Sequence, residues 1–278
     1  MNPYHIKGTK NSLGEIYHVA MHGCLISQDE SKLFGIAPNK WDRYADHLYE
    51  FLDDLKIAYR TDNVNDWREM GISETSNTIF SRFHKDTVAR KAKLIEVMAE
   101  ANNWEAPFEK ALKGTTPKVL IWLRCEDYEP YRNLNGTVVS QLIDWCLTKG
   151  YQPVLIGNSA NVKNEKSAIN LRDFWKDPFF KGKHFICKQL WFQHKLFQSF
   201  NMKASIGMMS GAMDGSSMFF GHKTIFFALE SDAKPRMSKV ALVVPGLNWF
   251  EVYYPKAAGL TELTCDELKR LHIMIDSD

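Results

Sequence analysis

Two polar segments of the sequence each follow a buried, strand-like run. "LRCED" (residues 123–127) continues the run "KVLIWL", and "MSGAMDGSS" (residues 209–217) comes directly after "ASIGM". The carboxyl ends of parallel strands share one edge of a sheet, and open α/β folds bind their ligands at that edge. We therefore expect the two segments to meet in one binding site.

The first segment places a cation and a carboxylate at the strand end. Arg124 comes immediately after the apolar run, and Asp127 follows three residues later. A guanidinium in this position can hold a diphosphate through two parallel hydrogen bonds. The structural alternative is an arginine and aspartate pair that only closes the strand end.

The second segment predicts a strand end followed by the start of a helix. Gly211 beside Ser210 lets the backbone approach a ligand closely, and the free amides at a helix start attract phosphate oxygens. A carboxylate at Asp214 repels phosphate, so we expect it to cap the helix or to bind a sugar or ribose hydroxyl. Gly215 and Ser216 complete the predicted donor site, and a tight, well-capped turn is the alternative.

A third loop, "IGNSAN", also comes directly after an apolar run. Its residues Gly157, Asn158 and Ser159 are candidates for contacts to a nucleotide base or ribose. A turn of this composition is common in α/β proteins, so the loop supports a ligand site only together with the other two.

The first third of the chain contains the candidates for a general base. Glu15 lies at the start of a predicted helix and is one candidate base. Its spacing from Ser12 is that of a capping box, which is a structural reason for a glutamate at this position. His5 is the second candidate base. His18 and His22 lie four residues apart, a spacing that can bind a metal. No carboxylate pattern accompanies them, so we interpret both as ordinary helix histidines and predict no metal site.

Alternating strand-like and helix-like segments predict a parallel sheet flanked by helices from residue 118 onward. The first third is mainly helical, with amphipathic patterns over residues 41–55 and 85–101. The irregular stretch 102–117 marks a domain boundary. We expect a last strand at 241–244 and a mobile excursion at 163–183.

Composition and charge exclude several classes of partner. A net charge of +2 gives no global field for a polyanion, so we expect no nucleic acid partner. No run approaches the roughly 18 apolar residues of a membrane span, and the first residues lack a signal-peptide pattern, which predicts a cytoplasmic protein. The five cysteines are scattered and odd in number, which indicates reduced thiols.

The order "VLIWLRCED", "GYQPVLIGNS" and "SIGMMSGAMDGSSMFFGHKTIFF" resembles the donor-binding half of GT-B glycosyltransferases, especially the fucosyltransferase-like and heptosyltransferase-like branches. In those families a strand ends in an arginine near an acidic residue, matched by Arg124 and Asp127. A Ser-Gly loop then opens a helix under the donor phosphates, matched by Ser210 and Gly211. Asp214 departs from the pattern, since it stands near that loop in place of an expected His or Thr.

The resemblance extends loosely to the start of the chain. "NSLGEIYHVA" is similar to the glycine-containing loop and helix that begin the acceptor half. The implied fold is α/β and GT-B-like, with a C-terminal parallel Rossmann-like sheet domain and a smaller, helix-rich N-terminal α/β domain. The expected divisions are an acceptor-side domain at 1–115, a nucleotide-sugar donor-binding domain at 116–262 and a C-terminal helix at 263–278.

The implied reaction is transfer of a hexosyl or pentosyl group from a nucleotide diphosphate sugar to a hydroxyl of a glycan or other acceptor. It needs no metal and no cofactor besides the donor substrate. Arg124 and the amides near Ser210 would stabilise the leaving diphosphate, and Glu15 or His5 would take the acceptor proton. The alternatives are another nucleotide-sugar enzyme, such as an epimerase or hydrolase, and a noncatalytic nucleotide- or glycan-binding module.

Overall fold

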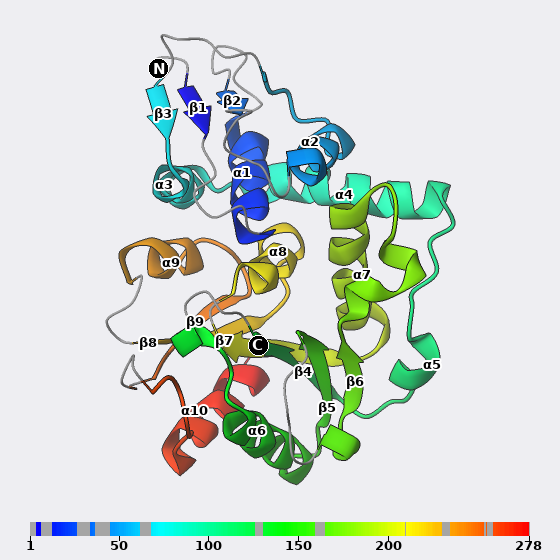
Figure 1. Cartoon of the computed structure of the whole chain (residues 1–278), viewed down its shortest axis with the longest axis vertical. Helices are drawn as coiled ribbons and strands as arrows, with labels where there is room; N and C mark the ends of the chain where they lie inside the picture. Colours follow the sequence, from blue (N-terminus) through cyan, green and yellow to red (C-terminus); the bar gives the residue numbers. More distant parts are fainter. Residues whose placement is uncertain are drawn as a thin grey trace.

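The chain forms two parallel β-sheets with helices packed between them. The computed structural model describes residues 4–6, 13–26, 34–36, 45–61, 68–125, 130–158, 165–208, 210–229, 234–252, 254 and 258–277. A three-stranded sheet lies at one end of the molecule and a six-stranded sheet lies toward the other (Figure 1). This arrangement confirms the predicted α/β class, with the smaller sheet in the N-terminal part.

The small sheet alternates strands and helices along the chain. Its strands are β1 (Tyr4–Ile6), β2 (Phe34–Ile36) and β3 (Arg68–Met70), which pair in parallel in the order β2-β1-β3. Helices α1 (Leu13–Ile26), α2 (Ala45–Asp54) and α3 (Ile72–Arg82) follow them in turn. Nearly every described residue of α1 is buried, so this helix is at the centre of the molecule.

Two helices lead from the small sheet to the large one. Helix α4 (Lys85–Ala101) matches the amphipathic pattern at 85–101 and packs against α1, α7 and α8. The short helix α5 (Glu109–Leu112) then precedes the large sheet. Figure 1 shows the connection from α4 to α5 descending along the side of the molecule, beside α7.

The large sheet has the strand order of a doubly wound nucleotide-binding fold. All six strands are parallel, in the order β6-β5-β4-β7-β8-β9, which is 3-2-1-4-5-6 when they are counted from β4. The strands are β4 (Lys118–Leu123), β5 (Gln152–Gly157), β6 (Ile169–Arg172), β7 (Met202–Met208), β8 (Thr224–Leu229) and β9 (Leu247–Val252).

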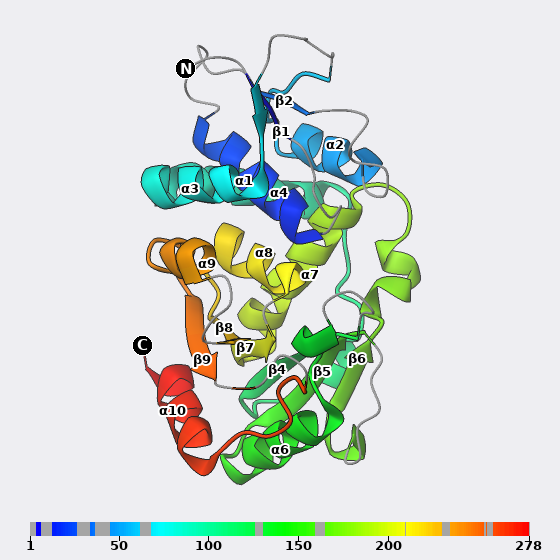
Figure 2. The ribbon, with the colours of Figure 1, turned by 60° about the vertical axis from the view of Figure 1, so that its left-hand side comes forward.

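Helices cover both faces of this sheet. Figures 1 and 2 show α6 and α10 on one face and α7, α8 and α9 between the two sheets. Alternate residues of β4 accordingly join separate cores, with Ile121 packing toward α6 and Trp122 toward α7 and α8. The helices are α6 (Gly136–Thr148), α7 (Phe185–Ser199), α8 (Gly211–Phe220), α9 (Lys234–Ala241) and α10 (Cys265–Asp276).

Two sequence expectations about this half are wrong. The last strand is β9 rather than residues 241–244, because α9 continues to Ala241 and the next residue, Leu242, is 79% exposed on a turn. The stretch 163–183 is not simply an excursion, since its described part contains strand β6 and short 3-10 turns. Phe174 and Phe180 from these turns are buried, and their rings lie 5.1 Å apart.

No helix in the described ranges has the length and apolar character that crossing a membrane requires.

Candidate functional site

The site is built around the point where the strand order of the large sheet reverses. Strands β4 and β7 are neighbours, yet the chain leaves β4 toward β5 on one side and leaves β7 toward β8 on the other. Open α/β sheets bind ligands in the crevice at this switch point, outside the carboxyl ends of the strands. Arg124 directly follows β4 and Ser210 precedes α8 just beyond β7, so both predicted segments leave the same edge.

Arg124 is held by a side chain from the loop before α6. It is half-buried, and its Nη1 donates a 2.6 Å hydrogen bond to Oδ1 of Asn133, which follows a short 3-10 turn (Pro130–Arg132). This bond orients the guanidinium at the strand end rather than leaving it to swing freely. Asp127, its predicted partner, lies outside the described residues.

The loop after β5 is tied to the segment that carries Arg124. Gly157 has φ +97°, and a Cβ there would collide with the carbonyl oxygen of Leu123, so the position requires glycine. The backbone amide of Asn158 donates a 3.0 Å hydrogen bond to the Leu123 carbonyl, and the side-chain Nδ2 of Asn158 donates a 3.2 Å hydrogen bond to the Cys125 carbonyl. Two of the three predicted loops are therefore side by side, while Ser159 lies outside the described residues.

Helix α8 begins at Gly211, within the segment where the sequence predicts a helix start. Ser210 is the N-cap residue, and among the described contacts its hydroxyl caps no amide of the helix. Met213 donates its amide hydrogen to the Ser210 carbonyl at 3.0 Å, in the tight geometry of a first turn. The first amides of a helix have no partner within it, so the start of α8 presents donors at the carboxyl edge of β7.

The start of α8 touches the start of α1. A Cβ added to Gly14 would lie 2.5 Å from the Gly211 Cα, and one added to Gly211 would collide with Gly14 in the same way. The two backbones approach this closely only because neither residue has a side chain. Glu15 follows Gly14 in the first turn of α1 and is 6% exposed, so a buried acidic residue of the small-sheet half comes directly after the glycine that contacts α8.

One turn further along α8, Asp214 faces a histidine of α1. His18 Nε2 lies 3.6 Å from Asp214 Oδ2, and both side chains are buried. The Ser76 hydroxyl donates its only hydrogen to the Ile72 carbonyl at 2.9 Å, so the 3.0 Å contact to His18 Nδ1 has the ring nitrogen as donor. Asp214 therefore joins the two halves of the molecule, a pairing that the sequence did not indicate.

Gly215 and Ser216 lie inside α8 and are buried. A Cβ on Gly215 would lie 2.8 Å from the Tyr17 ring, so this glycine lets α1 and α8 pack together. Burial raises the pKa of the Tyr17 hydroxyl, and the charge of the Asp214 carboxylate raises it further. The role of Gly215 and Ser216 in donor binding stays a prediction.

The remaining histidine candidates are buried in the small-sheet half. His5 occupies the middle of β1, the central strand, and its catalytic role stays a prediction. His22 lies edge-on to Phe34, with ring centres 5.7 Å apart, and burial followed by the Arg82 charge lowers its pKa to about 3. Across the described ranges, no three His, Cys, Asp or Glu side chains are placed to hold a metal ion.

The sequence predicted the individual segments of this site better than the contacts between them. Asn133, the Gly14–Gly211 contact and the His18–Asp214 pair were not anticipated, because each joins residues from separate elements. The available signal was a glycine at each of the two helix starts, in "SLGE" and in "MSGAM".

No family model and no curated protein matches the chain. Among solved structures it is similar to ADP-heptose lps heptosyltransferase II of E. coli (10% identity, TM-score 0.48, covering 99% of this chain and 98% of that one). It is also similar to a glycosyl transferase family 9 protein from Veillonella parvula (9%, TM-score 0.49, 90% and 86%). A third is E. coli heptosyltransferase with ADP-2-deoxy-2-fluoro heptose (12%, TM-score 0.41, 98% and 99%). Likeness at this level assigns no family, and the sheet order and the site geometry are the basis for the function considered next.

Proposed function

We propose that the protein is a glycosyltransferase that moves a sugar from a nucleoside diphosphate sugar to an acceptor hydroxyl. The observation that supports this most is that Arg124 and the start of α8 leave the same edge of the large sheet, on either side of the switch point. The Gly14–Gly211 contact joins the start of α1 to this helix start, and Glu15 is the next residue along α1.

The donor diphosphate would bind between Arg124 and the first amides of α8. A guanidinium offers paired hydrogen bonds to phosphate oxygens, and a helix start adds donors and a favourable dipole. Gly157 and Asn158 adjoin Arg124 and would contact the nucleoside, with Ser159 and Asp127 in the same loops. Asp214, Gly215 and Ser216 support this edge from inside α8.

In the proposed reaction, the bond from the anomeric carbon to the diphosphate breaks as the acceptor oxygen forms its own bond to that carbon. The acceptor proton passes to the Glu15 carboxylate, with His5 as the second candidate base. Negative charge grows on the leaving diphosphate, and Arg124 and the α8 amides stabilise it. The reaction needs no metal or cofactor, and a glycan is the expected acceptor.

A thermal-shift panel tests donor binding first. Nucleoside diphosphates and their pentose, hexose and heptose derivatives are added to the full chain. A ligand that binds only the folded protein raises the free energy of unfolding, by about 2.7 kcal/mol at about 100 times its Kd. We expect stabilisation by one nucleotide with its sugars. No shift with any member would remove the basis for a donor site.

Mass spectrometry of the products then separates the enzyme classes. A transferase releases nucleoside diphosphate and forms a glycosylated product only when an acceptor is present. Conversion of the donor to an isomer without acceptor identifies an epimerase, and release of free sugar identifies a hydrolase. Binding without any product identifies a noncatalytic module, and each of these three results contradicts the proposal.

A further inference from the structure

A concave surface lies along the connection from α4 to α5. It consists of two hollows of about 360 and 770 Å³ that share Trp104 and Ala106, and both volumes fall in the range of ligand pockets, roughly 300–1,000 Å³. We call this surface the linker groove; residues of 102–114 form one side and residues of 177–200 the other. Arg124, Ser210 and Gly211 are not among its lining residues.

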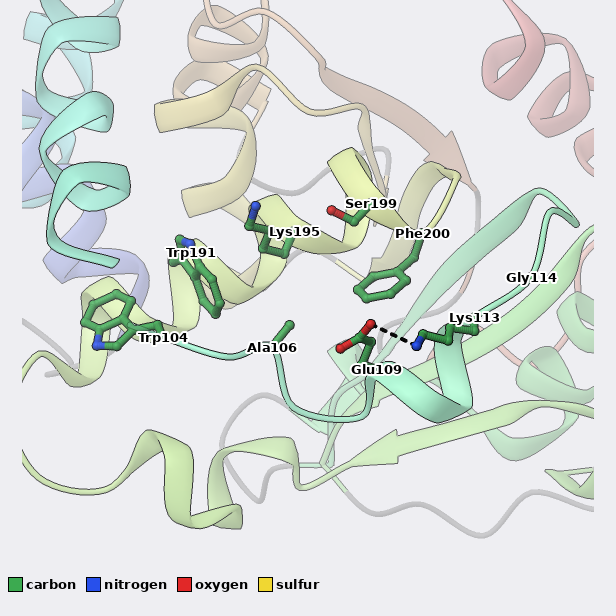
Figure 3. A pocket seen from close by; sticks show the side chains of 9 residues that line it. All are labelled: Trp104, Ala106, Glu109, Lys113, Gly114, Trp191, Lys195, Ser199 and Phe200. Atoms are coloured by element: carbon green, nitrogen blue, oxygen red, sulfur yellow. Dashed lines mark ion pairs between the residues drawn. The ribbon is translucent and has the colours of Figure 1, made fainter. Parts of the chain in front are cut away.

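Aromatic rings form the body of the linker groove. Trp104 is half-buried. Its ring centre lies 5.7 Å from that of Trp191, with an angle of 73° between the ring planes, and 6.1 Å from that of Phe179, with an angle of 87°. Figure 3 shows Trp104, Trp191 and Phe200 along the smaller hollow. Trp191 and Phe200 are buried, so the half-buried Trp104 is the ring that offers a rigid apolar face, on which the C–H face of a sugar ring can stack.

Polar groups of both signs surround these rings. Lys188 Nζ lies 5.6 Å from the centre of the Phe179 ring, and Lys195 Nζ lies 5.9 Å from that of Trp191. At the far end of the smaller hollow, Glu109 pairs with Lys113 at 3.2 Å (Figure 3).

The larger hollow combines hydrogen-bond donors with acceptors and has a balanced charge. Its lining includes two lysines (Lys183 and Lys188), two carboxylates (Glu105 and Asp177) and the amide of Asn103. A polyanion favours a surface of uniformly basic residues. A neutral ligand with many hydroxyls instead uses donors and acceptors together, which is what this lining offers.

The walls of the linker groove are fixed before any ligand binds. The Asp177 carboxylate accepts a 2.9 Å hydrogen bond from the Phe179 amide, and His184 Nδ1 lies 2.9 Å from Asp54 Oδ1 of α2. Asn103 and His184, which line the larger hollow, have φ of 50° and 63°, a backbone region that residues other than glycine rarely adopt. Such backbone is retained where the surroundings enforce it, and it is frequent at ligand clamps.

We propose that the linker groove is a binding site for a neutral oligosaccharide, separate from the donor edge, with Trp104 as its stacking face and Phe179 as the ring that holds Trp104 in place. The proposal concerns binding alone and does not depend on transfer activity. It follows from the combination of fixed aromatic faces, balanced charge and mixed donors and acceptors in a groove longer than a single hollow.

The test uses a printed array of neutral and acidic oligosaccharides, probed with the full-length chain. We expect retention on neutral oligosaccharides. No retention, or retention on acidic ones alone, would overturn the proposal. A retained oligosaccharide is then titrated by calorimetry into wild-type protein and the variants Trp104→Ala, Phe179→Ala and Phe80→Ala.

Phe80→Ala is the matched control. Phe80 is 37% exposed on α3, with Lys239 Nζ 6.0 Å from its ring centre, so it has the same ring and lysine pairing as Phe179 without belonging to either hollow. We expect about a tenfold or larger loss of affinity in Trp104→Ala and Phe179→Ala and none in Phe80→Ala. Equal affinity in all three variants would refute the site.

Two further variants keep the test valid if Trp104→Ala does not fold. Trp104→Phe retains an aromatic face, and Asp177→Asn retains an oxygen for the Phe179 amide while removing a charge. Both are expected to melt like wild-type protein. Trp104→Phe should bind the oligosaccharide more weakly because its ring is smaller, whereas Asp177→Asn should keep wild-type affinity because the ligand is neutral and the amide still donates and accepts; a large loss in Asp177→Asn would contradict a neutral ligand. Thermal stabilisation by nucleoside diphosphates should be the same in every linker-groove variant, which separates failure of this site from failure of the donor site.

Discussion

Gly14 and Gly211 bring the first residues of α1 and α8 into backbone contact, although they belong to different halves of the molecule. A methyl group at Gly14 would lie 2.5 Å from the Gly211 Cα, closer than real Cβ contacts. Relief would require one helix to move. The close approach of the two helix starts, and with it the position of Glu15 one residue after Gly14, therefore depends on two missing side chains.

Gly211→Ala should push α1 and α8 apart. Overpacking of this kind typically costs about 1–3 kcal/mol, and we expect a lower urea midpoint together with reduced product formation. Gly71→Ala is the control, because a Cβ at Gly71 meets no atom within 4 Å. Equal midpoints and equal activity in the two variants would show that the glycine contact has no role.

Glu15→Gln should slow the chemical step while preserving the fold. The two side chains have nearly the same shape, so a buried general base is removed with little change in packing, and kcat should fall about 10²–10⁴-fold. Steady-state kinetics measure this, with Glu100→Gln on the exposed side of α4 as the control. An unchanged kcat would exclude Glu15 as the base.

His18 and Asp214 should be energetically coupled across the two halves. The pair is buried at 3.6 Å, so a double-mutant cycle with His18→Ala and Asp214→Ala in urea unfolding should give a coupling of about 0.5–3 kcal/mol. The exposed pair Lys269–Asp266, at 3.0 Å, should give less than about 1 kcal/mol. Additive effects at His18 and Asp214 would mean that the two residues do not interact.

Stability should fall as the pH drops from about 6.5 toward 3. Burial lowers the pKa of both His22 and His222 to about 3, with Arg82 adding to the effect at His22 and His194 at His222. The unfolded chain binds protons at these histidines near pH 6.5, before the folded protein does, so lower pH favours unfolding. His22→Phe should show a smaller loss of urea midpoint between pH 7.5 and 5 than wild-type protein, and an equal loss would contradict this.

The sequence predicted those parts of the fold that depend on local pattern. The runs that became β4 and β8, and the amphipathic repeat of α4, are long enough to identify from apolar spacing alone. At the start of the chain, "YHI" suggests the short strand that is β1, whereas β2 and β3, with three residues each, have too few for a period to be recognised. Residues 241–244 look like a strand by composition, yet α9 ends there.

The site was predictable to the extent that sheet topology determines it. Arg124 and Ser210 share an edge because parallel strands β4 and β7 both end there. The contacts that join the two halves were not predictable, because Gly14–Gly211 and His18–Asp214 each depend on how helices from different sheets pack. One sequence carries no direct signal for such a pair.

Arg124 should bind the donor diphosphate because of its place at the switch point. Arg172 is the matched control, since it ends strand β6 of the same sheet and pairs with Glu165 at 2.7 Å, two strands away from β4. Calorimetric titration of the stabilising nucleoside diphosphate should give the same Kd for wild-type protein and Arg172→Ala, and a Kd at least about tenfold weaker for Arg124→Ala. The same Kd in all three proteins would contradict the role of Arg124 in binding the diphosphate.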